Sequence, residues 1–217
     1  MTCAHCRDIP RFFDPKVAAQ ELKRYRRKGP VKTTRILLDA LRAAGVKGRT
    51  LLDVGGGIGA IQHELLAAGA AQVVNADAAP AYQEAVREEA ERRGTADRIE
   101  FYAGDFVELA PALPSADLVT LDRVICCYPD MEKLVGASAE RARSLWGAVF
   151  PREYLGIRIA FRAINLIQRL RRQAFRVYVH PRAGVERVLR ARGLDPIAYR
   201  KTLLWQVMVW GRSRAAR

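Results

Sequence analysis

The chain has 217 residues, enough for one ordinary domain with a buried core or for a domain with a small cap. Half of the residues are hydrophobic, but no apolar run is long enough to span a bilayer. The net charge of +14 is unevenly spread. Lys and Arg outnumber the acids 10 to 3 in residues 1–35 and 16 to 3 in residues 151–217, whereas residues 36–150 have 11 Lys and Arg against 17 acids. This distribution argues against a uniformly basic nucleic-acid binder.

Two helices are predicted before the first strand. Residues 16–28 form a predicted basic helix that ends at a Gly-Pro pair, and a second helix is predicted from about residue 32 to residue 44. We therefore expect a basic N-terminal helical segment over residues 1–30, followed by one domain over residues 31–217. The two basic ends of the chain are expected to form one electropositive surface, around the mouth of a site.

Strands and helices then alternate along the chain. Apolar strands separated by helices are typical of a parallel sheet that helices cover on both faces. The predicted strands are residues 50–54, 71–76, 98–103, 116–121 and 144–150, and the helices that follow the first, second and fourth are residues 58–68, 80–93 and 131–143.

The pattern changes after Pro151. A long amphipathic helix is predicted over residues 153–173, within a cap insertion over residues 152–174, and a β-prone stretch and a helix follow it. Two strands then close the domain, and the tight link between them makes the last one antiparallel. The expected fold class is α/β, a Rossmann-like doubly wound seven-stranded sheet with N-terminal helices and a helical cap.

A glycine-rich loop follows the first strand. In "LLDVGGGIGA", Asp53 precedes a loop containing Gly55, Gly56, Gly57 and Gly59, which allows a tight turn into a helix and close approach of a ligand to the backbone. The spacing also satisfies the dinucleotide-binding pattern. A carboxylate here disfavours a pyrophosphate at the helix N-terminus and favours a cationic ligand.

Two further acids follow the next strands. Asp77 is placed for the hydroxyls of a ribose, and Asp105 is placed to accept a hydrogen bond from an adenine amine, with Phe106 beside the ring. Ligands of open α/β sheets bind outside the carboxyl ends of the strands, where these acids fall. Each acid alone also fits a helix N-cap, so the argument depends on the set.

Together these motifs resemble the class I S-adenosylmethionine-dependent methyltransferases, over about residues 31–211. The resemblance rests on Asp53-x-Gly55-x-Gly57-x-Gly59, Asp77, Gly104-Asp105 and the segment from Asp117 to Asp122. It implies that the glycine loop accommodates the methionine part of S-adenosylmethionine, that the next two acids bind ribose and adenine, and that residues after the fourth strand, Asp122 first, approach the sulfonium. It also implies in-line transfer of an activated methyl group, for which the protein mainly aligns and desolvates the reactants.

The segment "LDRVICCYPD" bears on the acceptor. The Asn/Asp-Pro-Pro-Tyr motif of amine-nitrogen methyltransferases and the Pro-Cys nucleophile of cytosine-C5 enzymes are both absent. The segment resembles "LD…LIHYP" of the magnesium-protoporphyrin O-methyltransferases, except that Cys127 replaces their active-site histidine. The resemblance therefore favours small-molecule methylation at oxygen or carbon, without the porphyrin ester reaction.

Three side chains are candidates for catalysis. His180 precedes a helix at the expected carboxyl edge of the sheet and is the first candidate base, with a surface turn as the alternative. Asp122 is placed to orient the sulfonium side or to act as base, and Tyr128 is placed to donate a hydrogen bond or to line the site. Tyr25, Arg123 and Cys127 are assigned to the substrate pocket.

The predicted cap helix carries arginines along one side. These arginines are placed to face acidic groups of a substrate or an anionic lipid, and a solvated lid face is the alternative; they are Arg158, Arg162, Arg169 and Arg172. We expect a small-molecule substrate, anionic or lipophilic. Peripheral membrane contact stays open, and nucleic acid is a less favoured partner.

The four cysteines complete the sequence evidence. No signal peptide is recognised, so reduced thiols in a cytoplasmic protein are expected rather than disulfides. Cys3 and Cys6 form half a zinc site, and Cys126 and Cys127 are expected to point to opposite faces of a strand-like segment, so no metal is assigned. The leading hypothesis is methyl transfer to a small or lipophilic molecule. The alternatives are an RNA or protein methyltransferase and a non-catalytic cofactor-binding module.

Overall fold

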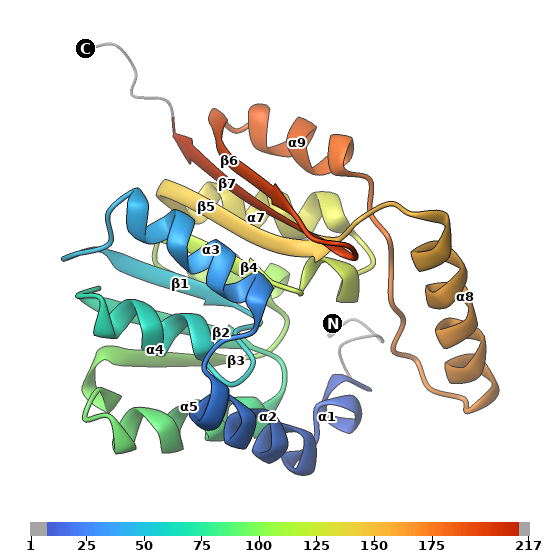
Figure 1. Cartoon of the computed structure of the whole chain (residues 1–217), viewed down its shortest axis with the longest axis horizontal. Coiled ribbons are helices and arrows are strands. Elements are labelled where there is room, and N and C mark those ends of the chain that lie inside the picture. Colours follow the sequence, from blue (N-terminus) through green and yellow to red (C-terminus); the bar gives the residue numbers. More distant parts are fainter. Residues whose placement is uncertain (1–7, 213–217) are drawn as a thin grey trace.

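The computed structural model describes residues 8–212, and a seven-stranded sheet forms its centre (Figure 1). The strand order is β3-β2-β1-β4-β5-β7-β6, and β7 is antiparallel to both of its neighbours. The strands are β1 (Thr50–Val54), β2 (Gln72–Asp77), β3 (Ile99–Ala103), β4 (Ala116–Asp122), β5 (Ala142–Pro151), β6 (Leu194–Lys201) and β7 (Trp205–Arg212). The predicted fold class, with its antiparallel last strand, is confirmed.

Helices cover both faces of the sheet. One face packs against α3, α4 and α5, and the other packs against α6, α7 and α9. The remaining helices, α1, α2 and α8, lie outside these two layers. The helices are α1 (Ile9–Phe12), α2 (Pro15–Lys28), α3 (Lys32–Ala43), α4 (Ala60–Ala67), α5 (Pro80–Arg92), α6 (Phe106–Leu109), α7 (Met131–Arg141), α8 (Leu155–Leu170) and α9 (Arg182–Arg190).

The core follows from the alternation of side chains along each strand. In β1, Leu51 packs into the layer with α3 and α4, and Leu52 packs into the layer with α7. Trp146 of β5 is fully buried, and its indole N–H donates to Ser138 Oγ at 2.9 Å. The parallel strands are apolar on both faces because both faces are covered.

The helix α2 is held against α5 by a small apolar cluster and by a buried carboxylate. Leu22 and Tyr25 of α2 pack against Tyr82 of α5. Glu89 of α5, whose side chain is fully buried, accepts a hydrogen bond from Arg26 Nε of α2 at 2.8 Å. The boundary at residue 30 stays a prediction, and α2 packs directly on the sheet domain.

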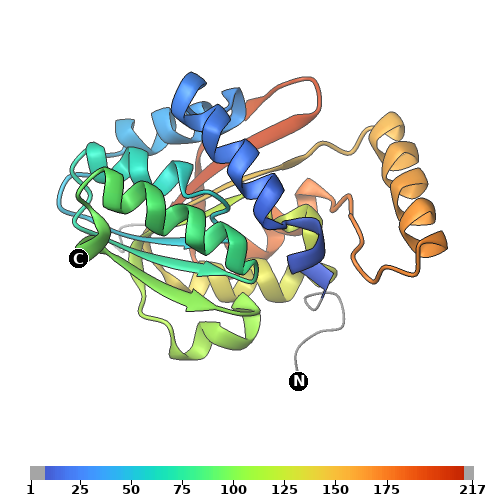
Figure 2. The same ribbon diagram turned by 90° about the horizontal axis from the view of Figure 1, so that it is seen from below.

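The helix α8 lies at the margin of the molecule, beyond the carboxyl ends of the parallel strands (Figures 1 and 2). The β-prone residues 175–179 form no strand, and they run back beside α8 instead. Asn165 of α8 donates its side-chain N–H to Val177 O and accepts from Val177 N, both at 2.8 Å. Within residues 8–212, no helix is both long enough and apolar enough to cross a membrane.

Candidate active site

A cavity of about 490 Å³ opens at the carboxyl ends of the parallel strands. The sheet supplies one side of its wall, through the glycine loop after β1 and the residues that end β2, β3 and β4. Helices α1, α2, α3 and α8 supply the other side, together with residues 175 and 177. This volume lies within the range of small-molecule pockets.

The glycine loop brings backbone to the cavity wall. Gly57 has a φ of +55°, and its N–H donates to Asp77 Oδ2 at 3.0 Å. A Cβ at Gly56 would lie 2.4 Å from Asp53 Oδ2, so any side chain there would collide with a buried carboxylate. Gly55, Gly56 and Gly57 line the cavity, whereas Gly59 lies behind the loop at the start of α4.

Asp53 supports the loop from below. Its carboxylate is fully buried and accepts from Thr120 Oγ1 at 2.6 Å and Gln62 Nε2 at 2.9 Å. Burial raises the pKa of Asp53 to about 7, against the hydrogen bonds that favour its ionised form. Asp53 is not part of the cavity wall, because the glycine loop covers it. The structure therefore does not support the predicted direct contact between Asp53 and a ligand.

Asp77 lies on the wall at the end of β2. Its two oxygens accept from Gly57 N at 3.0 Å and from Ala79 N at 2.8 Å, which fixes the carboxylate in one orientation. Burial raises the pKa of Asp77 to about 6, although the backbone N–H groups favour the charged form. Each carboxylate oxygen has capacity for a second hydrogen bond, from a ligand hydroxyl for example.

Asp105 and Phe106 line the cavity after β3. Asp105 caps α6 by accepting from Val107 N at 3.0 Å, so the N-cap alternative is correct, and its role toward adenine stays a prediction. Tyr128, from the segment after β4, donates its hydroxyl to Asp105 Oδ2 at 3.1 Å. Two predicted site residues from different strand ends are therefore joined in one polar contact.

Asp122 and Arg123 form the wall at the end of β4. Asp122 accepts a hydrogen bond from the Thr34 hydroxyl of α3, and its other oxygen lies 3.3 Å from Arg123 Nε. Arg123 has a φ of +63°, uncommon for a residue other than glycine, and it turns the chain sharply out of the strand. Its guanidinium Cζ lies 5.9 Å from the centre of the Trp205 ring.

The paired cysteines lie on a 3-10 turn, Ile125–Cys127, rather than on an extended segment. Both thiols line the cavity, with Cys126 Sγ and Cys127 Sγ 3.8 Å apart, so the expectation that they face opposite ways is wrong. A hydrogen bond between the thiols, with burial acting the same way, raises the pKa of Cys126. The same hydrogen bond lowers the pKa of Cys127. Among residues 8–212, no group of three or more His, Cys, Asp or Glu side chains is arranged to hold a metal ion, and Cys3 and Cys6 lie outside the described residues.

His180 does not reach the cavity. Its Nε2 lies 2.9 Å from the backbone oxygen of Tyr128, and the ring lies in a shallow depression with Pro129 and Asp130. Burial lowers the pKa of His180. The structure thus does not bring the first candidate base to the wall, because the hydrogen bond to Tyr128 O holds the ring on the outer side of the loop.

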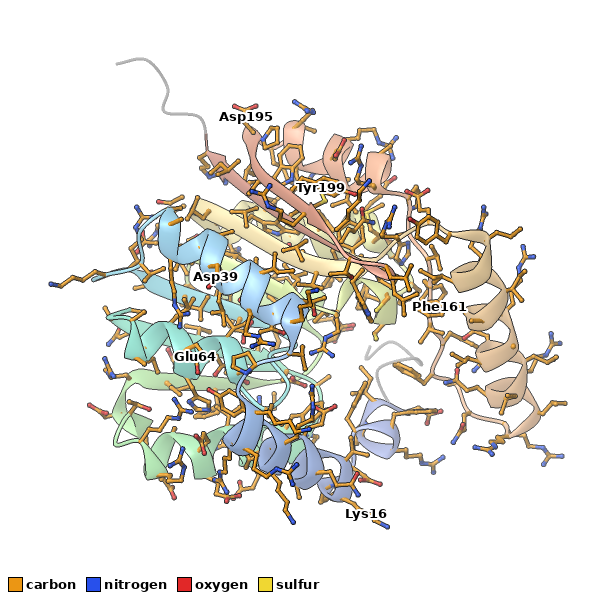
Figure 3. The ribbon with its side chains drawn as sticks, viewed as in Figure 1. Lys16, Asp39, Glu64, Phe161, Asp195 and Tyr199 are labelled. Carbon is orange, nitrogen blue, oxygen red and sulfur yellow. The ribbon has the colours of Figure 1, made fainter. Side chains whose placement is uncertain are left out.

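Several wall residues were not anticipated. Thr34 of α3 holds Asp122, and Phe13, Phe161 and Phe175 supply aromatic surface. Phe161 lies on the side of α8 that faces the rest of the molecule (Figure 3). The amphipathic pattern of this helix could have identified Phe161 as a wall residue, because Phe161 belongs to its apolar side. No sequence pattern indicates that Thr34 contacts Asp122.

The comparisons with known families place the match in the central part of the chain. Residues 51–145 match a family model described as "Methyltransferase domain". The chain is 34% identical over 106 residues to the ribosomal protein L11 methyltransferase of Aeromonas hydrophila and 38% identical over 106 residues to that of Tolumonas auensis. Each alignment covers 46% of this chain and 34% of the relative, so the chain spans about a third of the length of these relatives.

Solved structures share the fold over most of the chain. Magnesium protoporphyrin IX methyltransferase from Synechocystis PCC 6803, with bound S-adenosylhomocysteine, superposes with a TM-score of 0.70 at 20% identity, covering 94% of this chain and 98% of that one. An O-methyltransferase family protein from Burkholderia thailandensis has a TM-score of 0.68 at 17% identity, covering 93% of this chain and 61% of the other. At these identities the likeness concerns the fold.

Proposed function

We propose that the chain is a class I S-adenosylmethionine-dependent methyltransferase, and that it transfers the methyl group of that cofactor to a lipophilic small molecule, at an oxygen or a carbon atom. The cofactor supplies a methyl group that positively charged sulfur has already activated. The protein then has to bind the cofactor, hold the acceptor in line with the methyl group and exclude water.

The sheet side of the cavity fits the cofactor by the chemistry of its groups. Asp77 offers fixed carboxylate oxygens for the ribose hydroxyls, and Asp105 offers one for the adenine amine. The bare backbone of Gly57, where a Cβ would find nothing nearer than 3.9 Å, leaves room for the methionine part. Asp122 supplies negative charge for a sulfonium.

The observation that carries the acceptor proposal is the composition of the opposite wall. Phe13, Phe161, Phe175 and Val177 lie there, from elements outside the two helical layers of the sheet. Such a wall desolvates an apolar molecule without specifying its polar groups. Arg123, which also lines the cavity, provides one positive charge for an acidic substituent.

The acceptor chemistry that we propose uses residues at the end of β4 and in the segment after it. For an acceptor hydroxyl, Asp122 is the wall carboxylate that would take the proton, and the Thr34 hydroxyl would hold it in place. Tyr128, bound to Asp105, would position the acceptor by hydrogen bonding. A carbon acceptor that is already nucleophilic needs only alignment with the methyl group and no base.

The proposal is tested with methyl-labelled S-adenosylmethionine, the purified chain and an extract of the source cells. After reaction, the label is measured in the organic phase, the aqueous small molecules, the protein and the RNA. We expect label in the organic phase, and strongly reduced labelling with Asp77→Asn. Label confined to protein or RNA would contradict the proposed acceptor class.

A protein acceptor is the second candidate. It is supported by the ribosomal protein L11 methyltransferases that the chain resembles and by the excess of Lys and Arg at both ends of the sequence. The same experiment separates the two candidates, because label in a protein band that resists organic extraction would favour this one.

A further inference from the structure

The outward side of α8 is apolar and largely exposed. Ile157 and Gln168 are buried, and Phe161 is half-buried toward the cavity. On the opposite side, large aliphatic side chains extend from one end of the helix to the other. They are Leu155 (71% exposed), Ile159 (56%), Leu166 (58%), Ile167 (50%) and Leu170 (76%). Contiguous apolar surface of this kind marks an interaction site rather than ordinary solvent-facing helix.

Arginines border this apolar side. Arg158, Arg162 and Arg169 follow one another at helical spacing along its edge, and Arg171 and Arg172 follow the helix. All five are exposed, and no ion pair among the described residues involves any of them. The helix contains no Asp or Glu, so its whole charge is positive.

The turn between β6 and β7 extends the same surface. Leu203 is 78% exposed and Leu204 is 51% exposed. Arg152 N, just before α8, donates to Leu204 O at 2.9 Å, which places the turn beside the start of the helix. Figure 1 shows the tip of this hairpin directed toward α8. Arg200 and Lys201 are exposed nearby in the sequence of β6 and add positive charge.

We propose that α8 and the β6–β7 turn form a docking surface for anionic lipid bilayers. The aliphatic side chains would enter the boundary between headgroups and acyl chains, and the arginines would bind lipid phosphates. Long arginine side chains at the border of an apolar face reach the headgroups while their stems stay in apolar surroundings. A second copy of the chain fits poorly, because pairing through α8 would bring arginines against arginines.

Docking would also position the cavity. Phe161 of α8 and Val177, which Asn165 of α8 binds, both line it. The apolar wall of the cavity would then lie at the bilayer surface, where a lipophilic acceptor is dissolved. This last consequence rests on the proposed function, whereas the docking itself does not.

Vesicle sedimentation with the full chain tests the docking. We expect binding to phosphatidylcholine vesicles that contain phosphatidylglycerol, weak binding to phosphatidylcholine alone, and loss of binding at high salt. The triple variant Arg158→Gln, Arg162→Gln, Arg169→Gln should weaken binding about 100-fold, since each basic residue near an anionic surface contributes about a fivefold effect. Leu166→Asn with Leu170→Asn should weaken it at least about 10-fold.

A matched control removes the same charge elsewhere. Lys16→Gln, Lys23→Gln and Arg27→Gln, on the exposed side of α2, should leave vesicle binding within about twofold of the starting chain. The thermal midpoint and the affinity for S-adenosylhomocysteine show whether each variant is folded, and they report on the cofactor site separately from docking. Equal binding to neutral vesicles, or full binding by the arginine variant, would overturn the proposal. So would a dimer that only the leucine variant dissociates, without vesicle binding.

Discussion

The two sides of the cavity differ in the chemistry of their side chains. On the sheet side, Asp77 is buried and held between the N–H groups of Gly57 and Ala79. On the other side, the wall includes aromatic surface such as Phe13 and Phe161, with Glu21 and Arg24 of α2 as its charged members. Fixed carboxylates specify one polar ligand, whereas an apolar wall accepts a class of molecules by shape and size. If the proposed function holds, this difference predicts that cofactor binding and acceptor choice are separable, and substitutions on each side test that prediction.

The largest effect is expected where the two sides are joined. Burial opposes ionisation of Glu89, but hydrogen bonds from Arg92, Arg26 and Arg93 together outweigh it and hold the pKa of Glu89 well below its ordinary value. Glu89→Gln leaves these cations without their shared partner and should lower the free energy of unfolding by about 3 kcal/mol, measured by urea denaturation at neutral pH. Glu88→Gln, at a position 61% exposed, should cost about 0.5 kcal/mol or less.

The same carboxylate gives a pH dependence of known sign. Because the pKa of Glu89 is lower in the folded than in the unfolded chain, its contribution is fully present above the ordinary glutamate pKa of about 4.3 and is lost as the pH falls below it. The difference in stability between the original chain and Glu89→Gln should therefore shrink in acid. A difference that stays constant between neutral and acidic pH would contradict this account.

The next largest effect is expected from a substitution on the sheet side alone. Asp77→Asn removes one of two carboxylate oxygens that backbone N–H groups and the ribose would share, and it should weaken binding of S-adenosylhomocysteine about 100-fold, or about 2.8 kcal/mol, by calorimetry. Asp39→Asn on the exposed face of α3 is the control and should bind normally. Unchanged affinity of Asp77→Asn would remove Asp77 from the cofactor site.

A smaller effect is expected on the apolar side. Phe161→Ala opens the wall and should raise KM for a lipophilic acceptor about 10-fold, with the affinity for S-adenosylhomocysteine unchanged. Ile159→Ala, on the outward face of the same helix, should leave KM for a water-soluble acceptor as it was. If Phe161→Ala also weakened binding of S-adenosylhomocysteine, the two sides of the cavity would not act independently.

The smallest effect concerns a residue beneath the sheet side. Since burial raises the pKa of Asp53 to about 7, the folded chain binds a proton that the unfolded chain has released, and stability falls as the pH rises from about 4 to 7. Asp53→Asn should reduce this decline, and the part that remains is the contribution of Asp77, whose pKa burial also raises. The stability of Asp53→Asn at pH 5 should stay within about 1 kcal/mol, because Gln62 Oε1, which is buried without a hydrogen bond, can accept from the new amide. Denaturation at several pH values is the measurement, and a loss much larger than this would show that the amide is not accommodated.

The sheet was predictable because its pattern is local and repeated. The strand Thr50–Val54 was predicted with its observed bounds, and β7 was predicted as antiparallel. The helix α1 was missed because the four residues Ile9–Phe12 are too short for a periodic pattern. The residues predicted to bind the cofactor, other than Asp53 and Gly59, lie on the cavity wall, since they lie at or follow strand ends that the parallel topology brings to one edge.

The acceptor side depends on turns that the sequence pattern does not specify. The sequence predicts an extended segment at Cys126 and Cys127, but the backbone turns at Arg123 and continues into a 3-10 helix that brings both residues to the wall. His180 was placed at the correct edge of the sheet, yet its ring bonds to Tyr128 O outside the cavity. Element order fixes which loops gather at an edge, but side-chain direction within a loop depends on its individual backbone angles.

At Arg123, the backbone conformation favours glycine, whereas the proposed activity favours the arginine side chain. A left-handed conformation costs a residue with a Cβ about 1 kcal/mol, and glycine adopts it without that cost. Selection for thermal tolerance alone would therefore favour glycine there, whereas selection for turnover would retain the guanidinium beside Asp122. A mutational scan read once for abundance and once for methyl transfer should rank Arg123→Gly in opposite directions.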